Sequence, residues 1–254
     1  SFTQMMLLWV EASLINKLAI IIMAAGKGTR MNTELPKVLH KLNNKTMIEH
    51  VIDTTLKINP EKIIVVIGYK SELIKKQLND YNIEYAEQLE QLGTGHAIMQ
   101  CQNILNDFKG DTLILSGDVP LITKKTLSDL YKKHIEYKSK GTILSAIINN
   151  PTGYGRILRD KNSFISIVEE KDANEKQKKI NEVNTGIYIF NNQILFSNIN
   201  QINNHNNQSE YYLPDVLPII LKNKHQITVC KTSNELEIKG INTIQQLYDL
   251  EKQI

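Results

Sequence analysis

Two glycines and three cations stand close together in the loop that follows an apolar run near the start of the chain. Gly26 and Gly28 flank Lys27, Arg30 comes two positions later, and Lys37 follows behind a proline. Glycines let backbone N–H groups approach a ligand closely, and the basic side chains indicate that this ligand is anionic. An arginine offers a planar fork of donors to phosphate oxygens, and a lysine offers a compact charge. The loop therefore favours phosphate binding over its alternative, a glycine-rich turn with solvated basic residues.

The loop matches neither of the two common nucleotide-binding motifs. A dinucleotide fingerprint would need a third glycine at Met31, and the acidic residue expected further on would be Glu49, which lies in a helical pattern. A P-loop would need its lysine after the second glycine, but Lys27 lies between the two glycines. The remaining pattern is AAGxGTRM followed closely by PK.

Asp118 follows the apolar run Leu113–Ser116 and so should lie at the carboxyl end of a strand. A lone carboxylate there suits Mg²⁺, which takes oxygen ligands and keeps several waters. The alternative is an aspartate that caps a turn before Pro120. Opposite a basic phosphate loop, the metal interpretation is favoured.

The segment EQLEQLGTGHA contains groups that could recognise a nucleobase. Gln88 and Gln91 carry amides that both donate and accept hydrogen bonds, as contact with a base edge requires. Gly93 permits close backbone approach, and Thr94 can cap the following helix. His96 has no carboxylate partner nearby in the sequence. We therefore interpret it as a packed or capping residue and not as a general base.

Strand-like apolar runs alternate with helical patterns through the first half of the chain. This alternation predicts an α/β fold, with a Rossmann-like mixed, mostly parallel sheet flanked by helices and ligands at the carboxyl ends of its strands. The predicted strands are Leu18–Met23, Lys62–Ile67, Leu113–Ser116 and Thr142–Ile148, and the predicted helices are Thr46–Lys57, Ser71–Asn79, Thr94–Leu105 and Lys124–Lys138.

From Pro151 the pattern changes. Arg156–Arg159 and Phe164–Glu169 predict a hairpin, Asn184–Phe190 predicts a strand with aromatic character, and the asparagine-rich Asn198–Asn207 predicts a surface loop. These features indicate a smaller lobe of mixed sheet laid over the first half.

Composition excludes several classes of protein. The 254 residues are 41% hydrophobic and 22% charged with a net charge of +3, which gives no support for a basic nucleic-acid-binding face. No apolar run approaches the roughly 20 residues of a membrane span, so no membrane partner is expected. Cys101 and Cys230 have no metal-ligand spacing and predict reduced thiols in a cytoplasmic protein. Residues 1–17 lack the basic region of a signal peptide and are interpreted as an N-terminal extension.

Seven segments occur in a familiar order: LAIIIMAAGKGTRMNTELPKVLH, EQLGTGHA, SGDVPLI, PTGYGRI, IVEEKDA, NEVNTGIY and SEYYLPDV. Together they resemble the N-terminal uridyltransferase domain of the bacterial bifunctional N-acetylglucosamine-1-phosphate uridyltransferase/glucosamine-1-phosphate acetyltransferase family. The first segment alone indicates only the wider sugar nucleotidyltransferases, whereas PTGYGRI and NTGIY line the sugar side in this family. The resemblance implies a nucleotide-diphospho-sugar transferase fold with a sugar-binding lobe. It divides the chain into the extension, a transferase domain over 18–242 and the start of a linker helix over 243–254.

The resemblance also implies roles for individual residues. The residues implied to bind the nucleotide are Ala24, Ala25, Gly26, Lys37, Gln88, Gln91, Gly93 and Thr94. The residues implied to act on the phosphates of UTP are Arg30 and Lys37, and those implied to bind Mg²⁺ are Asp118 and Asn242. The residues implied to hold the sugar are Gly155, Glu169, Asn184 and Thr185, with Tyr211 and Tyr212 expected to help close its pocket.

The chain departs from the family pattern in three respects. Met23 replaces a usual leucine of similar volume, and Lys239 stands where an acid is usual, three residues before Asn242. The family's C-terminal hexapeptide-repeat β-helix, which carries acetyl transfer and trimer formation, has no counterpart in this sequence. We therefore expect a monomer for this stretch, and a homotrimer if the natural chain continues into such a domain.

The implied reaction is transfer of uridylyl from UTP to N-acetylglucosamine 1-phosphate, with Mg²⁺ as cofactor and UDP-N-acetylglucosamine and pyrophosphate as products. This product is a precursor of peptidoglycan and lipopolysaccharide. The attacking phosphate is already an anion at neutral pH, so no general base is required. Two alternatives stay open: a nucleotidyltransferase for another sugar or base, and a nucleotide-sugar sensor without turnover.

Overall fold

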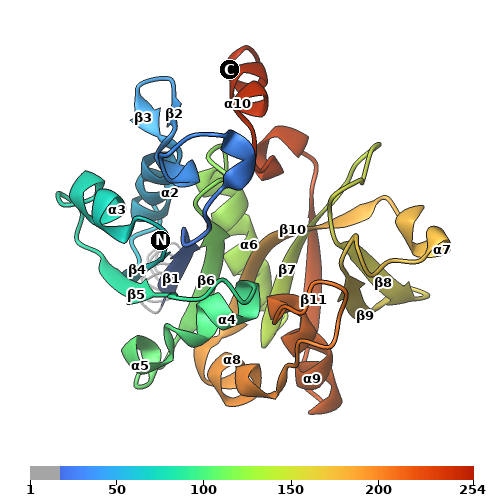
Figure 1. The fold of residues 1–254 in the computed structure, drawn as a ribbon. Helices are drawn as coiled ribbons and strands as arrows, with labels where there is room; N and C mark the ends of the chain where they lie inside the picture. Colours follow the sequence, from blue (N-terminus) through green and yellow to red (C-terminus); the bar gives the residue numbers. More distant parts are fainter. Residues whose placement is uncertain (1–17) are drawn as a thin grey trace, which may run out of the picture.

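Unbroken apolar runs form the central strands of the structure, a computed structural model that describes residues 18–254 (Figure 1). Strand β1 (Leu18–Met23) is buried along almost its whole length and pairs in parallel with β4 (Lys62–Ile67) and β6 (Asp111–Ser116). A parallel strand covered on both faces must be apolar at every position, which is why its sequence shows no alternation.

Further strands extend this sheet on both sides, and one of them reverses direction. They are β5 (Glu84–Glu87), β7 (Gly141–Ile147), β10 (Glu182–Asn191) and β11 (Ile227–Thr232). In the order β11–β7–β10–β6–β1–β4–β5, strand β10 is antiparallel to both of its neighbours, whereas the other pairs are parallel. Strand β10 therefore begins at the edge of the sheet where the parallel strands end.

Helices cover both faces of the sheet. One core contains side chains from α2 (Met47–Leu56), α3 (Ser71–Gln77) and α6 (Lys124–Glu136). The other contains side chains from α4 (Thr94–Met99), α5 (Gln102–Leu105), α8 (Asn192–Asn198) and α9 (Val216–Lys222). Strand β1 supplies both cores because successive side chains alternate between faces: Ile20 and Ile22 enter the first, Ala19 and Ile21 the second.

The single helix predicted over Thr94–Leu105 is wrong, because the structure divides it into α4 and α5. At the break, Gln100 and Cys101 donate backbone hydrogen bonds to Ala97 and Ile98, three residues back rather than four. This tightening ends α4 and allows α5 to start in a new direction.

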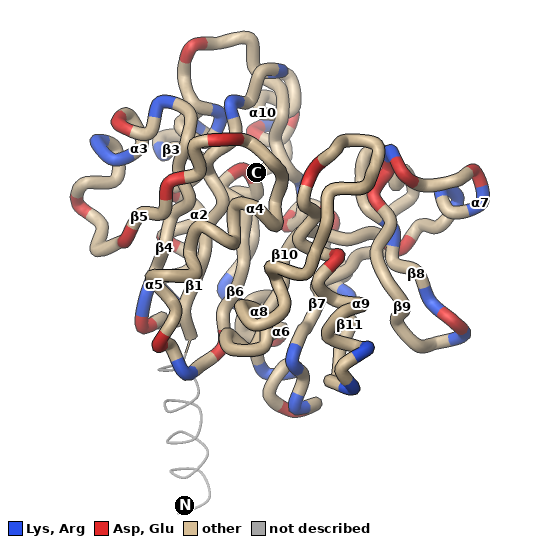
Figure 2. The backbone as a smooth tube through the Cα atoms, turned by 60° about the horizontal axis from the view of Figure 1, so that its bottom comes forward, with Lys and Arg blue, Asp and Glu red and all other residues tan. Residues whose placement is uncertain are grey.

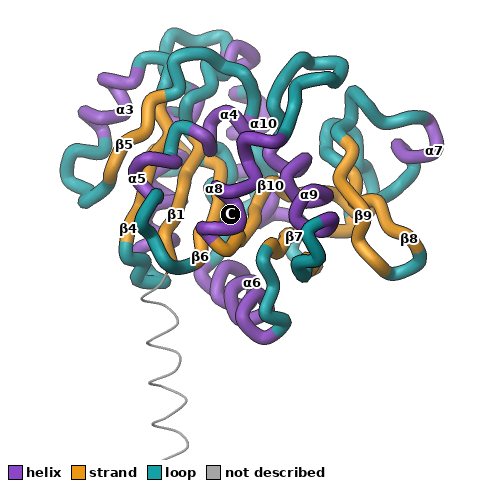
Figure 3. The backbone as a smooth tube through the Cα atoms, turned by 90° about the horizontal axis from the view of Figure 1, so that it is seen from below, coloured by secondary structure: helices purple, strands orange, loops and turns teal. Residues whose placement is uncertain are grey.

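The smaller lobe is a hairpin with one short helix. Strands β8 (Arg156–Asp160) and β9 (Ser163–Val168) form the hairpin, and α7 (Glu175–Lys178) lies beside it, away from the main sheet (Figure 3). Strands β7, β10 and β11 belong to the main sheet and not to this lobe. The surface loop predicted from Asn198 begins later than expected, because a helical turn continues over Ile199–Gln201 with Ile199 buried in the second core.

The last helix brings the end of the described chain back to the phosphate loop. Helix α10 (Ile244–Glu251) begins with a capping box formed by Thr243 and Gln246. Its Leu247 and Leu250 pack with Met31 in a third apolar cluster, beside the small hairpin β2 (Lys41–Leu42) and β3 (Lys45–Thr46). The predicted extension over 1–17 lies outside the described residues.

Charged residues are mixed over the surface. In the view of Figure 2, Lys and Arg are interspersed with Asp and Glu along most of the loops. No helix within residues 18–254 is long and apolar enough to cross a membrane.

Candidate active site

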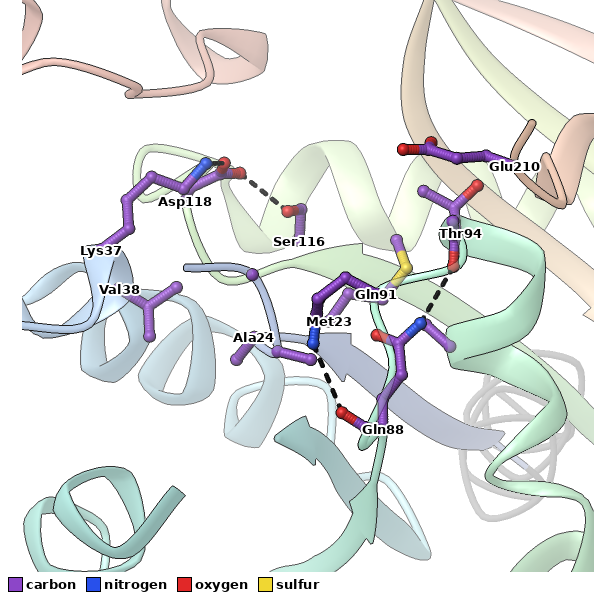
Figure 4. A pocket seen from close by; sticks show the side chains of 14 residues that line it. Met23, Ala24, Lys37, Val38, Gln88, Gln91, Thr94, Ser116, Asp118 and Glu210 are labelled. Atoms are coloured by element: carbon purple, nitrogen blue, oxygen red, sulfur yellow. Dashed lines mark hydrogen bonds and ion pairs between the residues drawn. The ribbon is translucent and has the colours of Figure 1, made fainter. Parts of the chain in front are cut away.

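A cavity of about 250 Å³ lies at the edge of the sheet where the parallel strands end (Figure 4). All of the residues predicted to bind the nucleotide line it, together with Asp118: Ala24, Ala25, Gly26, Lys37, Gln88, Gln91, Gly93 and Thr94. The other lining residues were not singled out as site residues from the sequence, and they are Met23, Val38, Ala97, Ser116 and Glu210.

The glycine-rich loop leaves β1 and closes around the side chain of Lys37. Gly28 has φ +64°, a left-handed conformation that favours glycine. A Cβ atom at this position would collide with Cβ of Lys37. The glycine therefore serves two purposes, because it allows the turn and leaves room for the lysine beneath it. Lys27 is exposed on the same loop.

The Lys37 ammonium holds the two side chains that were predicted to bind metal. Its Nζ forms an ion pair with Asp118 and donates a hydrogen bond of 3.0 Å to Oδ1 of Asn242. Arg30 donates to the same amide oxygen over 3.1 Å, and the Ser116 hydroxyl donates to Asp118 over 2.7 Å. Lys37 and Asp118 are each only 16% exposed, so little water screens this pair. Three segments far apart in the sequence thus meet at one cation: the loop of Arg30 and Lys37, the end of β6 with Asp118, and the segment of Asn242.

The oxygen atoms that converge on Lys37 suit a hard divalent cation. Within residues 18–254, no group of three or more His, Cys, Asp or Glu side chains could hold a metal ion. A metal between Asp118 and Asn242 would therefore complete its shell with water and ligand phosphates. Mg²⁺ is commonly bound in this way, by one or two carboxylates plus phosphates and waters. The donor set fits Mg²⁺, since both oxygens already face one positive charge.

Lys239 lies close in sequence to this corner but its side chain is directed elsewhere. Its ammonium donates to Oε1 of Gln253 over 3.4 Å. The backbone N–H of Ile241 donates to the carbonyl oxygen of Asp118 over 2.9 Å, which holds the segment of Asn242 beside the strand β6 loop.

The opposite wall of the cavity is built from amides. Gln88 is 3% exposed and its Nε2 donates to the carbonyl of Gly93 over 3.2 Å and lies 3.1 Å from Nδ1 of His96. The Gln91 amide donates to the backbone oxygen of Gln88 over 3.3 Å. His96 also contacts Gln100, so the prediction of a packed histidine is confirmed. Gln88 thereby orders the loop, and Gln91 remains the more exposed of the two amides.

Gly68 belongs to this wall although the sequence interpretation did not include it. A Cβ atom there would lie 2.7 Å from the Gln88 carbonyl oxygen, 2.8 Å from Nε2 of Gln91 and 3.0 Å from the Ala25 carbonyl oxygen. The contact with the Gln88 backbone oxygen is shorter than real Cβ contacts allow, so any other residue would displace the loop of Gln88. A glycine directly after the predicted strand Lys62–Ile67 was the signal that could have revealed it.

The residues predicted to hold the sugar come together beside the hairpin and not among the lining of the first cavity. Gly155 accepts a backbone hydrogen bond of 2.8 Å from Asn184. A Cβ on Gly155 would lie 3.2 Å from the Glu169 carboxylate, so the two residues are in close contact. The Asn184 amide donates to the Tyr188 hydroxyl over 2.6 Å, and the Thr185 hydroxyl donates to the Leu144 carbonyl over 2.7 Å.

A bulge in β10 positions Asn184 and Thr185. The register with β7 shifts between Asn184 and Tyr188, and Gly186 within this stretch has φ +78°. A bulge bends its strand and redirects side chains, and such features are frequent next to active sites.

Two carboxyl groups in this region, those of Glu169 and Asp215, have raised pKa values. Burial raises the pKa of the Glu169 carboxyl to about 7, with smaller contributions from the nearby carboxylates of Asp215, Asp172 and Glu210. Burial, aided by Asp172, also raises the pKa of Asp215 to about 6. Carboxyl groups with strongly raised pKa values are frequent at functional sites.

A strap of residues joins the two halves of the site. The Tyr212 hydroxyl donates to Asp172 over 3.0 Å, whereas the backbone N–H and C=O of Tyr211 bond to Leu92 and Gly95 of the base-side loop. Glu210 lines the first cavity and also acts on Glu169. Tyr212 therefore contacts the segment that follows Glu169, and Tyr211 contacts the loop at the start of α4.

A cationic corner facing an amide wall, at the carboxyl edge of a mostly parallel sheet, defines a nucleotide-binding α/β protein. The profile of one such family, described as nucleotidyl transferase, matches residues 19–235. The chain belongs to this family.

Bacterial relatives confirm the resemblance noted from the sequence. The chain is 45% identical over 223 residues to "Bifunctional protein GlmU" of Bacillus subtilis, which covers 87% of this chain and 49% of the relative. It is 45% identical over 232 residues to the protein of that name from Clostridium beijerinckii, covering 91% and 51%. For Streptococcus pyogenes serotype M3 the identity is 47% over 223 residues, covering 87% and 48%. The chain thus spans about half the length of these relatives.

Among solved structures, a UDP-glucose pyrophosphorylase complexed with UDP-glucose has the same fold. The TM-score is 0.72 over 94% of this chain and 98% of that chain, at 17% sequence identity. The expected nucleotide-diphospho-sugar transferase fold is therefore confirmed.

The raised pKa of Glu169 leads to a prediction about pH and stability. An acid with a raised pKa costs stability only when it ionises. The cost is absent below its unfolded pKa of about 4.5 and complete above its folded pKa of about 7. The free energy of unfolding, measured in urea at about pH 5 and about pH 8, should therefore fall more with rising pH in the wild type than in Glu169→Gln. An equal fall in both proteins would contradict the assignment. Glu90→Gln, at an exposed carboxylate, should behave like the wild type.

Proposed function

We propose that this chain transfers uridylyl from UTP to N-acetylglucosamine 1-phosphate, yielding UDP-N-acetylglucosamine and pyrophosphate. The observation that carries the proposal is the meeting of Lys37, Asp118 and Asn242 across from the Gln88–Gln91 wall. It provides cations for phosphates and amides for a base in one cavity. The similarity to bacterial bifunctional GlmU proteins supports the choice of base and sugar.

The nucleotide half would hold UTP between the two walls. The backbone of Ala24, Ala25 and Gly26 would face the nucleoside, and Gln91 would offer its exposed amide to the uracil edge. Gly93 and Thr94 would close over the base from the start of α4. Lys37 and Arg30 would bind the phosphates, as a compact charge and a planar fork of donors.

The reaction brings together two anions, so the residues act mainly through charge and position. An oxygen of the sugar phosphate attacks the α-phosphorus in line, a new P–O bond forms, and pyrophosphate leaves with the electron pair of the bond that breaks. Lys37 and Arg30 would offset the repulsion between the anions and stabilise the charge that develops. No side chain needs to remove a proton, because the attacking oxygen is already ionised.

Asp118 and Asn242 would hold Mg²⁺, which supplies further neutralisation of phosphate charge when bound. In the structure they hold the Lys37 ammonium. Phosphates of the nucleotide would draw Lys37 away from Asp118 and so leave both oxygens available to the metal.

The sugar half would be completed by the hairpin lobe. Gly155, Glu169, Asn184 and Thr185 would line it, with Glu169 as the acceptor for hydroxyl or amide donors of N-acetylglucosamine. The structural relative was solved with a nucleotide sugar, which supports a sugar beside the nucleotide. The product would serve cell-wall precursor synthesis in the cytoplasm.

The direct test mixes each of the four nucleoside triphosphates with several sugar 1-phosphates and Mg²⁺ and measures pyrophosphate release. UTP with N-acetylglucosamine 1-phosphate should give the highest kcat/KM. A different preferred pair would establish another nucleotidyltransferase. Binding of both substrates without pyrophosphate release would establish a sensor.

Asp118→Ala should lower kcat by on the order of 10²-fold or more, the typical loss when one essential electrostatic group is removed. Pyrophosphate release at saturating substrates is the measurement. Asp129→Ala, which removes an exposed aspartate of α6, is the matched control and should retain wild-type turnover. Near-normal, Mg²⁺-dependent turnover by Asp118→Ala would refute the metal assignment.

Lys37→Met should tighten Mn²⁺ binding to the nucleotide-free protein by about tenfold, equivalent to ~1.4 kcal/mol, because the ammonium no longer competes for Asp118 and Asn242. Electron paramagnetic resonance of free Mn²⁺ measures this without any turnover. Lys27→Met removes an exposed cation of the same loop and should leave Mn²⁺ affinity unchanged. Unchanged or weaker binding by Lys37→Met would show that the lysine does not occupy the metal position.

A further inference from the structure

Arg156 is the most deeply buried charged side chain of the hairpin lobe, with 1% exposure. Each nitrogen of its guanidinium donates at least one hydrogen bond. Nη1 contacts the Tyr154 carbonyl and the Glu170 carboxylate, the latter at 2.6 Å. Nε donates to the Ile180 carbonyl over 3.1 Å, and Nη2 donates to the Lys178 carbonyl over 3.2 Å.

These partners belong to three segments, and each segment carries a residue assigned to the sugar. Tyr154 directly precedes Gly155, and Glu170 directly follows Glu169. The carbonyls of Lys178 and Ile180 lie just before β10, which carries Asn184 near its start. One side chain therefore joins the three segments that would surround the sugar.

Backbone contacts connect the same segments. Val183 pairs with Arg156, the Asn184 N–H donates to the Gly155 carbonyl over 2.8 Å, and the Gly153 N–H donates to Glu170 over 3.2 Å. A shift of Arg156 would consequently move the loop before β8 relative to both Glu169 and Asn184.

We infer that Arg156 is a positioning residue for the sugar-phosphate pocket: it sets the spacing of Gly155, Glu169 and Asn184 without touching the sugar. This inference rests on the proposed function. Arginine is required because its planar fork serves several acceptors at fixed angles, whereas a lysine ammonium is a single point charge. Supporting groups of this kind hold binding residues in their productive geometry.

The same strand provides a matched control. Arg159 of β8 donates two hydrogen bonds of 2.8 Å to Glu182 and one of 2.9 Å to the Asn162 carbonyl. It thus joins β8 to β10 through a guanidinium–carboxylate pair, but its hydrogen bonds do not reach the Tyr154 loop or Glu170. Arg159→Gln therefore removes a comparable structural pair while the Arg156 contacts remain.

The experiment compares Arg156→Gln, Arg156→Lys and Arg159→Gln. Arg156→Gln should raise KM for N-acetylglucosamine 1-phosphate by on the order of tenfold or more, as small misplacements of binding groups do, with KM for UTP within twofold of wild type. Arg156→Lys should recover only part of this loss. Arg159→Gln should lower the unfolding midpoint but leave both KM values unchanged.

Two results would overturn the inference, because either would indicate a general loss of lobe structure. In the first, Arg156→Gln raises both KM values equally. In the second, Arg159→Gln raises the sugar-phosphate KM as much as Arg156→Gln does. If Arg156→Gln does not fold, Glu170→Gln takes its place. This substitution removes the carboxylate that pairs with Arg156, on a side chain that is 28% exposed, and should raise the sugar-phosphate KM selectively.

A second readout separates this inference from the proposed function. Hydrogen exchange at the amides of Gly153 and Tyr154 should speed up in Arg156→Gln and stay at the wild-type rate in Arg159→Gln. This measurement needs no substrate. If the wild type releases no pyrophosphate, the proposed function fails, while the exchange result still reports whether Arg156 orders the loop. Unchanged exchange in Arg156→Gln would refute the positioning role.

Discussion

One antiparallel strand within the main sheet determines where both halves of the site can lie. Parallel strands end at a common edge, so the loops after β1, β4 and β6 gather there through chain direction alone. Strand β10 runs the opposite way between β6 and β7 and therefore begins at that edge. Its bulge at Gly186 turns Asn184 and Thr185 out of the regular ladder. The cavity and a second set of polar groups therefore lie at the same edge of the sheet.

The two sides differ in charge, and the difference suits two kinds of ligand group. On one side Lys37 pairs with Asp118 and Arg30 bonds to Asn242 beside it, an environment that favours phosphates. On the other side burial holds the pKa values of Glu169 and Asp215 well above their usual range, an environment that favours neutral donors such as hydroxyls and amides. Glu210 lines the cavity and also helps to raise the pKa of Glu169, so the charge of Glu210 acts on both sides.

Some elements could be predicted residue by residue, and others could not. Strands Leu18–Met23 and Lys62–Ile67 were predicted with their observed bounds, because a strand buried on both faces must be apolar throughout. Strand Ile227–Thr232 was missed, since it lies at the edge of the sheet and mixes apolar with polar residues. The break after α4 was also missed, because the helical spacing of apolar residues continues through it. The tightened hydrogen bonds of Gln100 and Cys101 do not change that spacing.

Residue types and their spacing were enough to predict which chemistry the chain offers: a loop for phosphates, a carboxylate at a strand end and amides before a helix. Contacts between these groups came from long-range folding. Asn242 lies 205 positions from Lys37, yet the two share a hydrogen bond beside Asp118. Nothing in the sequence around Arg156 indicated that its side chain joins three segments. Local periodicity in the sequence specifies helices and strands. The order and direction of the strands in the sheet decide which distant loops meet, and therefore which charged groups and carbonyls come into contact.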